Sequence, residues 1–412
     1  MSDIKDAALA AEGMCKIDWV KEHMPILAAI EKEVAVTKPL DGIRVAVCVH
    51  LEAKTARLCL LLKEAGAEVV CTGSNPLSTK DDVAAALAQS GVTVFARHGC
   101  DMDTYYRHLN MALDIKPNLV MDDGGDLLEI MLDSRRGLLD TVWAVCEETT
   151  TGVARAKARE RAGALPIPFM NVNDAMCKHL FDNRYGTGQS AWEGIIRATN
   201  LQVSGKTAVV AGYGWCGRGI AGVAAGLGAK VIVTEIDPIK AIEAVMDGHE
   251  VMSMDEAAAK GDFFITATGS IDIITRRHFE VMKHGAILAN AGHFDVEIDK
   301  KALFDMAGQP VRMREYVEAY NLPDGKSVYL LSEGRLVNVT SGDGHSAEIM
   351  DMSFAIQALT LIYCAQKRAA LKPGVHAVPD DIDRRVAGIR LKAMGVSIDK
   401  QTPEQRGYNE GV

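Results

Sequence analysis

The chain has 412 residues, a formal net charge of −10 and nine cysteines. This length allows two or three domains, and a composition of 48% hydrophobic and 24% charged residues argues against intrinsic disorder. The acidic balance argues against nucleic acid or an anionic membrane as a main partner. The cysteines are odd in number and never spaced CxxC, which predicts reduced thiols, no metal site and a cytoplasmic protein. Because Asp3, Asp6 and Glu12 interrupt the start of the chain, we expect no secretory signal there.

The first half of the chain alternates short β-branched runs with longer amphipathic segments. Helices are expected at 53–65 and 81–89, the second after the N-cap signal Ser78-Thr79. Near-continuous apolar strands that alternate with helices predict parallel βαβ units covered on both faces. The expected strands lie at 43–51, 68–72, 92–96, 119–123, 142–147 and 167–172.

The same pattern restarts near residue 207 with a strand, a glycine-rich turn and a helix. After this second block we expect a hairpin, whose strands 328–331 and 335–338 flank a Ser-Glu-Gly turn. The sequence therefore predicts an α/β protein with two doubly wound parallel-sheet domains, the second an NAD-binding Rossmann domain. The strands of the second block are expected at 207–211, 230–235, around Val251, 263–268 and 286–291.

An apolar helix is expected over 352–366. Its apolar stretch is too short to span a bilayer, and it is interrupted by Ser353, Gln357 and Thr360. A buried helix of a soluble protein is therefore the better interpretation. A polar tail begins near Pro373.

The glycine-rich turn reads Gly-Tyr-Gly-Trp-Cys-Gly and matches the GxGxxG fingerprint of dinucleotide binding. The motif alone is weak, but it follows a strand, opens a helix and precedes the acidic Glu235 at the next strand end. Gly212 permits the tight turn, Gly214 admits the pyrophosphate, and Gly217 allows close helix–strand packing. Glu235 would accept from both ribose hydroxyls and repel a 2′-phosphate, which favours NAD over NADP. Asn290 is expected on the nicotinamide side, with a simple turn residue as the equal alternative.

Polar clusters also follow several other expected strands, and ligands bind at the carboxyl ends of strands in open α/β sheets. Any one cluster alone is more often a cap or a surface ion pair. Six together, beside a separate dinucleotide fold, make a wholly structural explanation poor. The clusters contain His50, residues 122–126, residues 147–152, Lys178 with Asp182 and Asn183, His293 and His345.

In chain order, the sequence contains HLEAKTA, SNPLSTKDDVAAAL, MDDGGD, EETTTGV, NVNDAMCKHLFDNRYG, VVAGYGWCGRG, TEIDP, GHFDVEID and EGRLVN. Together these segments resemble the S-adenosylhomocysteine hydrolase family, and in particular its short bacterial and archaeal branch. The resemblance runs from about Trp19 to Asp383. It implies a tightly bound NAD that changes redox state and is restored within each turnover.

The family oxidises the 3′-hydroxyl of the substrate ribose, which makes the neighbouring 4′ C–H acidic. A base removes that proton, homocysteine leaves from the 5′ carbon, water adds, and the ketone is reduced again. By resemblance, Lys178 lies against the 3′-hydroxyl, Asp182 orients it, and Asp123 is the acid near the 4′ carbon. An amine acting as a base needs a lowered pKa, which we expect a dry, closed site to supply.

The resemblance also assigns the remaining polar residues. Glu148 joins the catalytic group as a ribose contact, His50 and His293 surround the 5′ carbon, and His345 is a hinge residue close to the purine. Substrate contacts are implied for Glu52, Lys54, Thr55, Thr149, Asn183 and His345. Besides the glycine turn, Glu235 and Asn290, contacts to NAD are implied for Thr149, Thr150, Thr151, Asn183 and Asn338.

The sequence departs from the family at the purine pocket. Many members carry a threonine and a glutamate where this chain has Glu52 and Lys54. A glutamate accepts from the adenine amino group, whereas an ammonium donates to a carbonyl such as O6 of hypoxanthine. One interpretation is therefore an S-inosyl substrate. The alternatives are that the two side chains pair with each other, that Glu52 takes over the amino group, or that the change marks lineage.

Two further departures concern the cofactor. Thr187 stands where many relatives have a cysteine, for which we expect redox tuning. The lysine and tyrosine that end longer relatives are not recognisable, so we expect NAD to be held less tightly. The expected domains are 1–184 with 346–372 for substrate and 185–345 for NAD, with a tail, 373–412, that makes oligomer contacts.

The leading interpretation is a hydrolase whose two domains close over a cleft, working as a homo-oligomer, either a tetramer or a dimer. One rival is an inert NAD-binding regulatory relative, which the complete set of catalytic residues disfavours. Another is an NAD-dependent 2-hydroxy-acid dehydrogenase, which gives no role to the EETTTG and FDN motifs.

Overall fold

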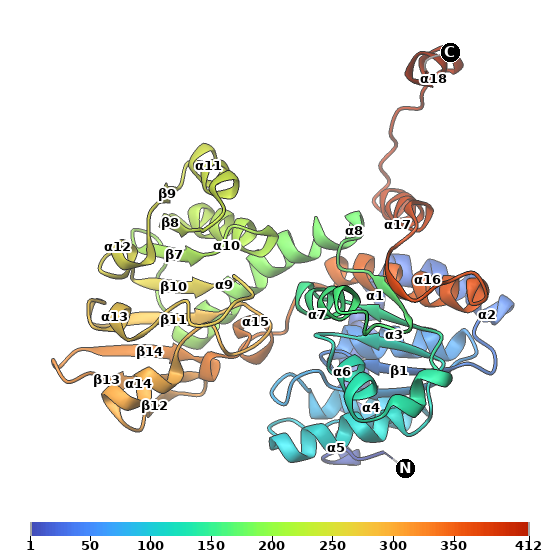
Figure 1. The fold of residues 1–412 in the computed structure, drawn as a ribbon, viewed down its shortest axis with the longest axis horizontal. Helices are drawn as coiled ribbons and strands as arrows, with labels where there is room; N and C mark the ends of the chain where they lie inside the picture. The colour runs from blue at the N-terminus through green and yellow to red at the C-terminus, as the bar shows by residue number, and fades with distance from the viewer. Residues whose placement is uncertain (1, 411–412) are drawn as a thin grey trace.

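The computed structural model describes residues 2–410 and contains two α/β units, each built on its own sheet (Figure 1). The first sheet is entirely parallel, with the strand order β15-β6-β5-β4-β1-β2-β3. Its strands are β1 (Arg44–Cys48), β2 (Glu68–Thr72), β3 (Thr93–Phe95), β4 (Leu119–Asp122), β5 (Ala144–Glu147), β6 (Pro168–Asn171) and β15 (Gly374–Ala377).

Helices cover both faces of this sheet because its strands are apolar on both sides. One face packs on α1 (Ala10–Glu22), α2 (Pro25–Thr37), α3 (Ala53–Glu64), α4 (Asp81–Gln89), α16 (Ala347–Lys367) and α17 (Asp380–Ala393). The other face packs on α5 (Met102–Leu113), α6 (Asp126–Asp133) and α7 (Thr150–Arg161).

The second sheet has the strand order β12-β13-β14-β11-β10-β7-β8-β9. From β14 to β9 it is parallel, and β12 and β13 extend one edge in antiparallel pairing. Its strands are β7 (Thr207–Ala211), β8 (Lys230–Thr234), β9 (Glu250–Val251), β10 (Phe263–Thr266), β11 (Ala286–Asn290), β12 (Val311–Arg314), β13 (Val317–Asn321) and β14 (Ser327–Leu331). Its helices are α9 (Thr187–Thr199), α10 (Trp215–Gly226), α11 (Pro238–Met246), α12 (Met254–Ala258), α13 (Arg276–Phe279), α14 (Lys300–Ala307) and α15 (Val337–Thr340).

Both sheets repeat one plan, in which the chain winds outward from a central strand and then reverses. The orders β3-β2-β1-β4-β5-β6 and β9-β8-β7-β10-β11-β14 are each the 3-2-1-4-5-6 order of the dinucleotide-binding fold. Each sheet therefore has a switch point, between β1 and β4 and between β7 and β10, where a crevice opens at the carboxyl ends of the strands. The predicted fold class is confirmed.

The predicted hairpin at 328–338 is wrong. β14 is already paired with β11 on one side and with β13 on the other, so it has no free edge to receive a returning strand. The hairpin is instead formed by β13 and β14. After β14 the chain continues forward, makes a single parallel bridge between Leu336 and Asn290, and enters α15.

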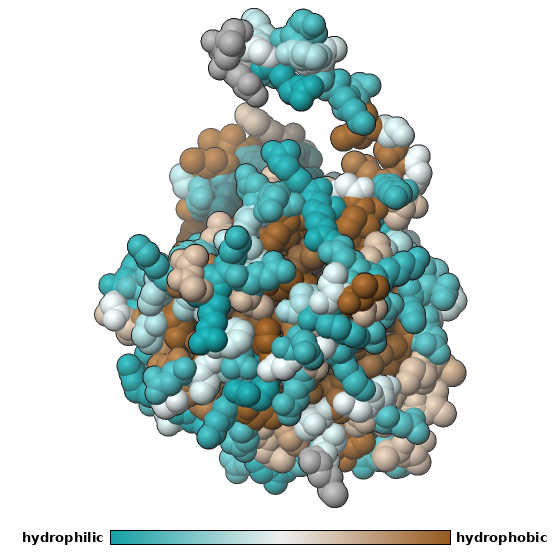
Figure 2. Space-filling model, turned by 90° about the vertical axis from the view of Figure 1, so that its right-hand side faces the viewer, coloured by the Kyte–Doolittle hydropathy of each residue, from teal (hydrophilic) through white to brown (hydrophobic). Residues whose placement is uncertain are grey.

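The segment expected as a tail begins as part of the first domain. β15 pairs with β6 and adds the seventh strand of the sheet, and α17 packs on α16, α2 and α8 (Met176–His179). Only the later part extends away from the body, ending in α18 (Pro403–Glu410) (Figures 1 and 2).

The chain crosses between the two sheets twice. The first crossing runs through α8, a π-helical segment (Asp182–Gly186) and α9; the second lies between α15 and α16. Among the described residues, α16 is the one helix that is long and apolar enough to span a membrane. It is buried against α2, α3, β4 and β5, as expected for a core helix.

Asp351 on α16 caps the start of a neighbouring helix. Its carboxylate accepts from the backbone N–H groups of Ile26 and Leu27, both at 2.8 Å. These donors belong to the first turn of α2, which leaves them without partners inside the helix. Burial raises the pKa of Asp351 to about 6, and the two backbone donors act in the opposite direction.

We predict that Asp351→Ala lowers the free energy of unfolding by about 1–3 kcal/mol, because two buried donors lose their acceptor. Chemical denaturation of the purified protein measures this change. Glu348→Ala, which removes an exposed acid from the same helix, is the matched control and should change stability by less than about 0.5 kcal/mol. Equal effects of both variants would contradict the capping role.

Candidate active site

A cavity of about 1220 Å³ lies between the two domains, at the carboxyl ends of both sheets. It is lined from the first domain by residues that follow β1, β4 and β5, and from the second by residues that follow β7, β8 and β11. The predicted site residues that line it are His50, Glu52, Lys54, Thr55, Asp123, Glu148, Thr149, Thr150, Thr151, Lys178, Asp182, Asn183, Gly212, Gly214, Glu235, His293, Asn338 and His345.

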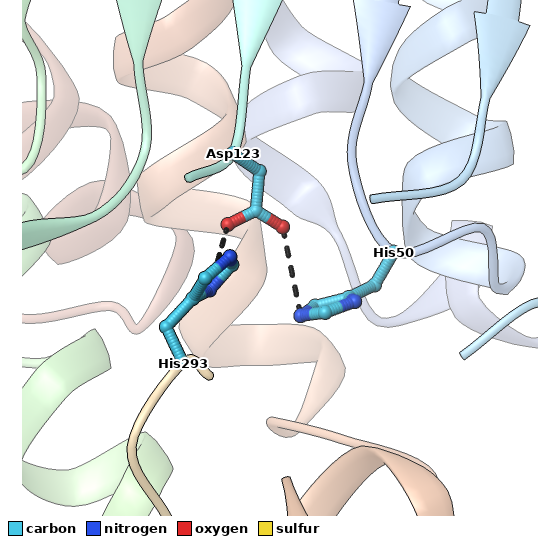
Figure 3. Close-up of side chains that lie close together, drawn as sticks. All are labelled: His50, Asp123 and His293. Atoms are coloured by element: carbon cyan, nitrogen blue, oxygen red, sulfur yellow. Dashed lines mark ion pairs between the residues drawn. The ribbon is translucent and has the colours of Figure 1, made fainter. Parts of the chain in front are cut away.

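Asp123 lies between two histidines that come from different domains (Figure 3). His50 Nε2 is 3.5 Å from Asp123 Oδ2, and His293 Nδ1 is 3.7 Å from Asp123 Oδ1. The hydroxyl of Ser74 donates to Asp123 Oδ2 at 2.8 Å and lies 3.1 Å from His50 Nδ1. Gly124, at φ +105°, makes this approach possible, since a Cβ there would lie 2.2 Å from His293 Nε2.

The environment of this cluster favours a charged Asp123 and a neutral His293. Burial disfavours the Asp123 carboxylate, but His50, His293 and the Ser74 hydroxyl outweigh it and hold the pKa of Asp123 below its usual value. Burial lowers the pKa of His293, against the attraction of Asp123. His293 therefore offers a neutral imidazole, which can accept or relay a proton near neutral pH.

A second cluster surrounds the ammonium of Lys178, which is 4% exposed. Its Nζ lies 3.6 Å from Glu148 Oε1 and 3.5 Å from Asp182 Oδ1, and it donates to Asn183 Oδ1 at 2.8 Å. Asn173 accepts from both Lys178, at 3.4 Å, and Asn183, at 3.1 Å. The π-helical segment carries Asp182 and Asn183, and such segments are frequent at functional sites.

The two carboxylates beside Lys178 have opposite pKa shifts. Burial raises the pKa of Glu148 to about 7, although Lys178 acts against it. Burial also disfavours the Asp182 carboxylate, but Lys178, His345 and Ser353 outweigh it and hold its pKa well below the usual range. Pairs of acids whose pKa values are pushed apart mark acid–base roles. Glu148 is therefore the carboxyl of the pair that can exchange a proton near neutral pH.

The expected lowering of the Lys178 pKa is contradicted. Burial does favour the neutral amine, but the charges of Asp182 and Glu148 outweigh it and raise the pKa of Lys178. A dry site was the premise of the expectation, and the premise holds. The expectation itself failed because two carboxylates lie in the same dry site, and their negative charges stabilise the protonated form of Lys178.

His345 links the second chain crossing to this cluster. Its Nδ1 is 3.0 Å from Asp182 Oδ1, and its Nε2 is 3.3 Å from the Thr187 hydroxyl. Asn338 approaches the same nitrogen at 3.3 Å. Thr187 also donates to the sulfur of Cys216 at 3.6 Å, so a cysteine does lie beside this position, supplied by the glycine-rich turn.

Glu52 and Lys54 form a buried ion pair of 2.7 Å. Glu52 caps α3 by accepting from the backbone N–H of Lys54 at 3.0 Å. The Lys54 ammonium also donates to the backbone carbonyl of Asp343 in the second crossing, at 2.9 Å. Thr55 is tied down nearby, because its hydroxyl donates to the His50 carbonyl at 2.6 Å. This ion pair matches one of the alternatives left open by the sequence, namely that Glu52 and Lys54 pair with each other.

The glycine-rich turn forms a cradle that fits a dinucleotide. Gly212 has φ +92°, and a Cβ on Gly217 would lie 1.9 Å from the Gly212 carbonyl, so helix α10 packs tightly on the turn. A Cβ on Gly214 would meet nothing within 4 Å, which leaves room for pyrophosphate at the N-terminus of α10. Glu235 lines the cavity, and its carboxylate accepts from the backbone N–H of Tyr213 at 2.7 Å. It also accepts from the backbone N–H groups of Ile236 and Asp237.

Asn290 does not line the cavity. It is fully buried, and its amide donates to the carbonyls of Gly292, Phe294 and Gly334, while its Oδ1 accepts from Gly292 and Thr266. These contacts use the whole polar capacity of the side chain to hold the loop that carries His293. The alternative interpretation, a turn residue, describes this position.

Four polar residues of the site were not predicted from the sequence. Ser74 and Asn173 follow β2 and β6, and a strand-end signal could have found them. Ser353 and Gln357 were noticed only as interruptions of an apolar helix. Ser353 donates to Asp182 Oδ2 at 2.7 Å, and Gln357 donates to Glu148 Oε2 at 2.6 Å.

We predict that Gly214→Ala weakens NAD binding by about tenfold or more while leaving the fold intact, because its Cβ enters only the space for the pyrophosphate. Titration calorimetry with NAD and thermal unfolding without it measure the two effects separately. Gly222→Ala, on the exposed face of the same helix, is the control and should keep normal binding. Loss of stability in Gly214→Ala without loss of affinity would contradict the cradle.

Comparison with known proteins agrees with this site. The family model described as S-adenosyl-L-homocysteine hydrolase matches residues 2–144, and that of its NAD binding domain matches residues 183–344. An adenosylhomocysteinase from Pyrococcus abyssi is 56% identical over 407 residues, which cover 99% of this chain and 96% of the relative. One from Thermococcus kodakarensis is 55% identical, covering 99% and 97%. An S-inosyl-L-homocysteine hydrolase from Methanocaldococcus jannaschii is 53% identical over 410 residues, covering 100% and 99%.

The relatives match over nearly the whole length of both chains, and they include both printed names, adenosylhomocysteinase and S-inosyl-L-homocysteine hydrolase. The predicted resemblance, the enzyme assignment and the cofactor NAD are confirmed. The printed names of these relatives are those of hydrolases, which does not support the rival interpretation of an inert homologue. With both family models matched across its two domains, the chain belongs to the S-adenosyl-L-homocysteine hydrolase family, the NAD-dependent hydrolases of a nucleoside thioether.

Proposed function

We propose that the protein catalyses the reversible hydrolysis of S-adenosyl-L-homocysteine to adenosine and L-homocysteine. The observation that carries the proposal is the continuity of one cavity, which joins the dinucleotide cradle to two buried acid–base clusters. A ribose held between them meets a redox cofactor on one side and proton acceptors on the other. That combination is what transient oxidation at the 3′ carbon requires.

NAD, when bound, supplies the oxidation of the 3′-hydroxyl and the later reduction at the same carbon. Gly212, Gly214 and Glu235 would hold it, and the same cavity is also lined by Thr149, Thr150, Thr151, Asn183 and Asn338. Lys178 can take up the proton of the 3′-hydroxyl only after its own proton has moved to Glu148, a transfer that the raised pKa of Lys178 opposes and the raised pKa of Glu148 eases. Glu148 supports this role because its pKa is raised to about 7, while Asp182 stays ionised and orients the amine.

Asp123 is the base for the 4′ proton, once the 3′ carbon has been oxidised and that C–H has become acidic. His50 and His293 lie on its two carboxylate oxygens and are placed to deliver a proton to the leaving thiolate and to activate water at the 5′ carbon. Because His293 comes from the second domain, this cluster is complete only when the domains are together. Closure excludes bulk water from the oxidised sugar.

Glu148 also has a free acceptor in the cavity. Its Oε1 is buried and has no hydrogen-bond partner within residues 2–410. Lys178 Nζ faces this oxygen at 3.6 Å, beyond hydrogen-bond length. A buried acceptor without a hydrogen bond costs about 1–3 kcal/mol, so a donor from the ligand is expected there. A ribose hydroxyl satisfies it.

We predict that Lys178→Met lowers homocysteine release by about a hundredfold or more, since a positioned acid–base group contributes that much. The assay follows the released thiol with NAD-loaded enzyme, and NAD affinity is measured in parallel. Lys157→Met, which removes an exposed lysine from α7, should retain full activity. A Lys178→Met enzyme that turns over normally would contradict the proposal.

A second candidate substrate is S-inosyl-L-homocysteine, and Lys54 is the observation that favours it. Its ammonium uses two of its three N–H donors on Glu52 and Asp343, which leaves one for a purine acceptor. Hypoxanthine offers O6 as an acceptor and N1–H as a donor to the Glu52 carboxylate. Adenine offers N1 as an acceptor and its amino group as a donor. Lys54 as donor and Glu52 as acceptor can therefore form hydrogen bonds with either purine.

We predict that Lys54→Met lowers kcat/KM for the S-inosyl thioether about tenfold to a hundredfold more than for the S-adenosyl thioether. The ratio between the two substrates is the measurement, because loss of the contact between Lys54 and Asp343 affects both alike. An unchanged ratio would show that Lys54 does not read the purine. In the wild type, a strong preference for the adenosyl substrate would exclude the inosyl alternative.

A further inference from the structure

The core helix α16 carries three polar side chains that an apolar helix does not need. Ser353, Gln357 and Thr360 are each 0% exposed. Burying hydroxyl and amide groups is unfavourable unless they find hydrogen-bond partners. The Ser353 hydroxyl and the N–H of the Gln357 amide find theirs in the active site, whereas Thr360 Oγ1 and Gln357 Oε1 have no partner within residues 2–410.

Ser353 and Gln357 are four residues apart and therefore lie on one face of α16. Ser353 donates to Asp182 Oδ2 at 2.7 Å, and Gln357 donates to Glu148 Oε2 at 2.6 Å. The remaining oxygens of the two acids, Asp182 Oδ1 and Glu148 Oε1, lie 3.5 and 3.6 Å from Lys178 Nζ. A single turn of helix thus holds the outer oxygen of both carboxylates that flank the ammonium.

We propose that Ser353 and Gln357 are positioning residues that fix the orientation and the charge of the two carboxylates beside Lys178, and so set the pH range of turnover. The inference rests on the proposed roles of Lys178 and Glu148. Neither Ser353 nor Gln357 lines the cavity. Both act by donating a hydrogen bond to the far side of a carboxylate, which stabilises its ionised form.

The two acids are supported unequally, and this gives them different tasks. Asp182 is also held by His345 at 3.0 Å, so it remains ionised even without Ser353. Glu148 relies on Gln357 and Lys178 alone, with Asp123 and Asp182 acting as nearby negative charges. Lys178 in turn faces Asp123 and Cys216 besides its two partners. Gln357 is therefore the donor to which the titration of the cluster is most sensitive.

The test uses Gln357→Met in the NAD-loaded enzyme, which keeps the side-chain volume and removes the donor. Glu148 then loses support for its ionised form, so its pKa rises further. Since Glu148 must be ionised to accept the Lys178 proton, the acidic limb of the kcat profile moves upward. We expect a shift of about one pH unit with KM changed by less than about threefold.

Three further variants keep the test specific. Ser353→Ala should lower kcat severalfold without moving the limb, because His345 and Lys178 keep Asp182 ionised, and Ser353→Thr, which retains the hydroxyl, should restore part of the loss. Thr360→Val removes an equally buried hydroxyl from the same helix and should leave kcat and the limb unchanged. Thermal unfolding and NAD affinity of every variant are measured alongside.

An acidic limb that stays in place in Gln357→Met, while kcat falls equally at every pH, would overturn the inference and leave only a packing role. A limb that moves equally in Thr360→Val would overturn it as well. Failure of the proposed function has a different signature, namely a wild-type enzyme that releases no homocysteine from either thioether. The two failures are therefore distinguishable.

Discussion

The burial of one ammonium group constrains much of this molecule. Lys178 is almost inaccessible, and a charge removed from water is tolerated only when opposite charges and hydrogen bonds replace the solvent. Asp182 and Glu148 supply the charges, and they need donors of their own, which come from Ser353, Gln357 and His345. All three donors lie on α16 or directly before it. These donors reach the cluster because the chain returns to the first domain after completing the second, so that the first domain is split in sequence.

The cavity follows from using one sheet plan twice. Each sheet opens a crevice at its switch point, and the two crevices face each other across the cavity. One crevice holds a cradle with space for pyrophosphate, and the other holds the acid–base side chains. The contact of His293 with Asp123 joins them, and Gly124 makes that contact sterically possible. The proposed chemistry therefore needs both domains together.

Sequence reasoning located most of the strands, both α/β units and most of the cavity lining, because strand periodicity and the residues after a strand end are local signals. It missed β12, β13 and β15. It failed where the outcome depended on distant partners. The hairpin was wrong because β11 and β13 already occupy both edges of β14. The direction of the Lys178 pKa was wrong because its two carboxylates were not counted in the burial argument. Ser353 and Gln357 were visible as anomalies, but their partners lie about 170 and 210 residues away in the chain, beyond any local pattern.

The double crossing between the domains has a mechanical consequence. A single linker would allow the domains to rotate about several axes, whereas two adjacent linkers restrict the rotation to one axis. The crossings do lie side by side, since His345 of one is 3.0 Å from Asp182 of the other. Relative motion is then restricted chiefly to rotation about the line through both segments. An opening rotation about this line would part His293 from Asp123, which belong to different domains. Lys178 and Asp182 both belong to the first crossing, so their pairing would be kept.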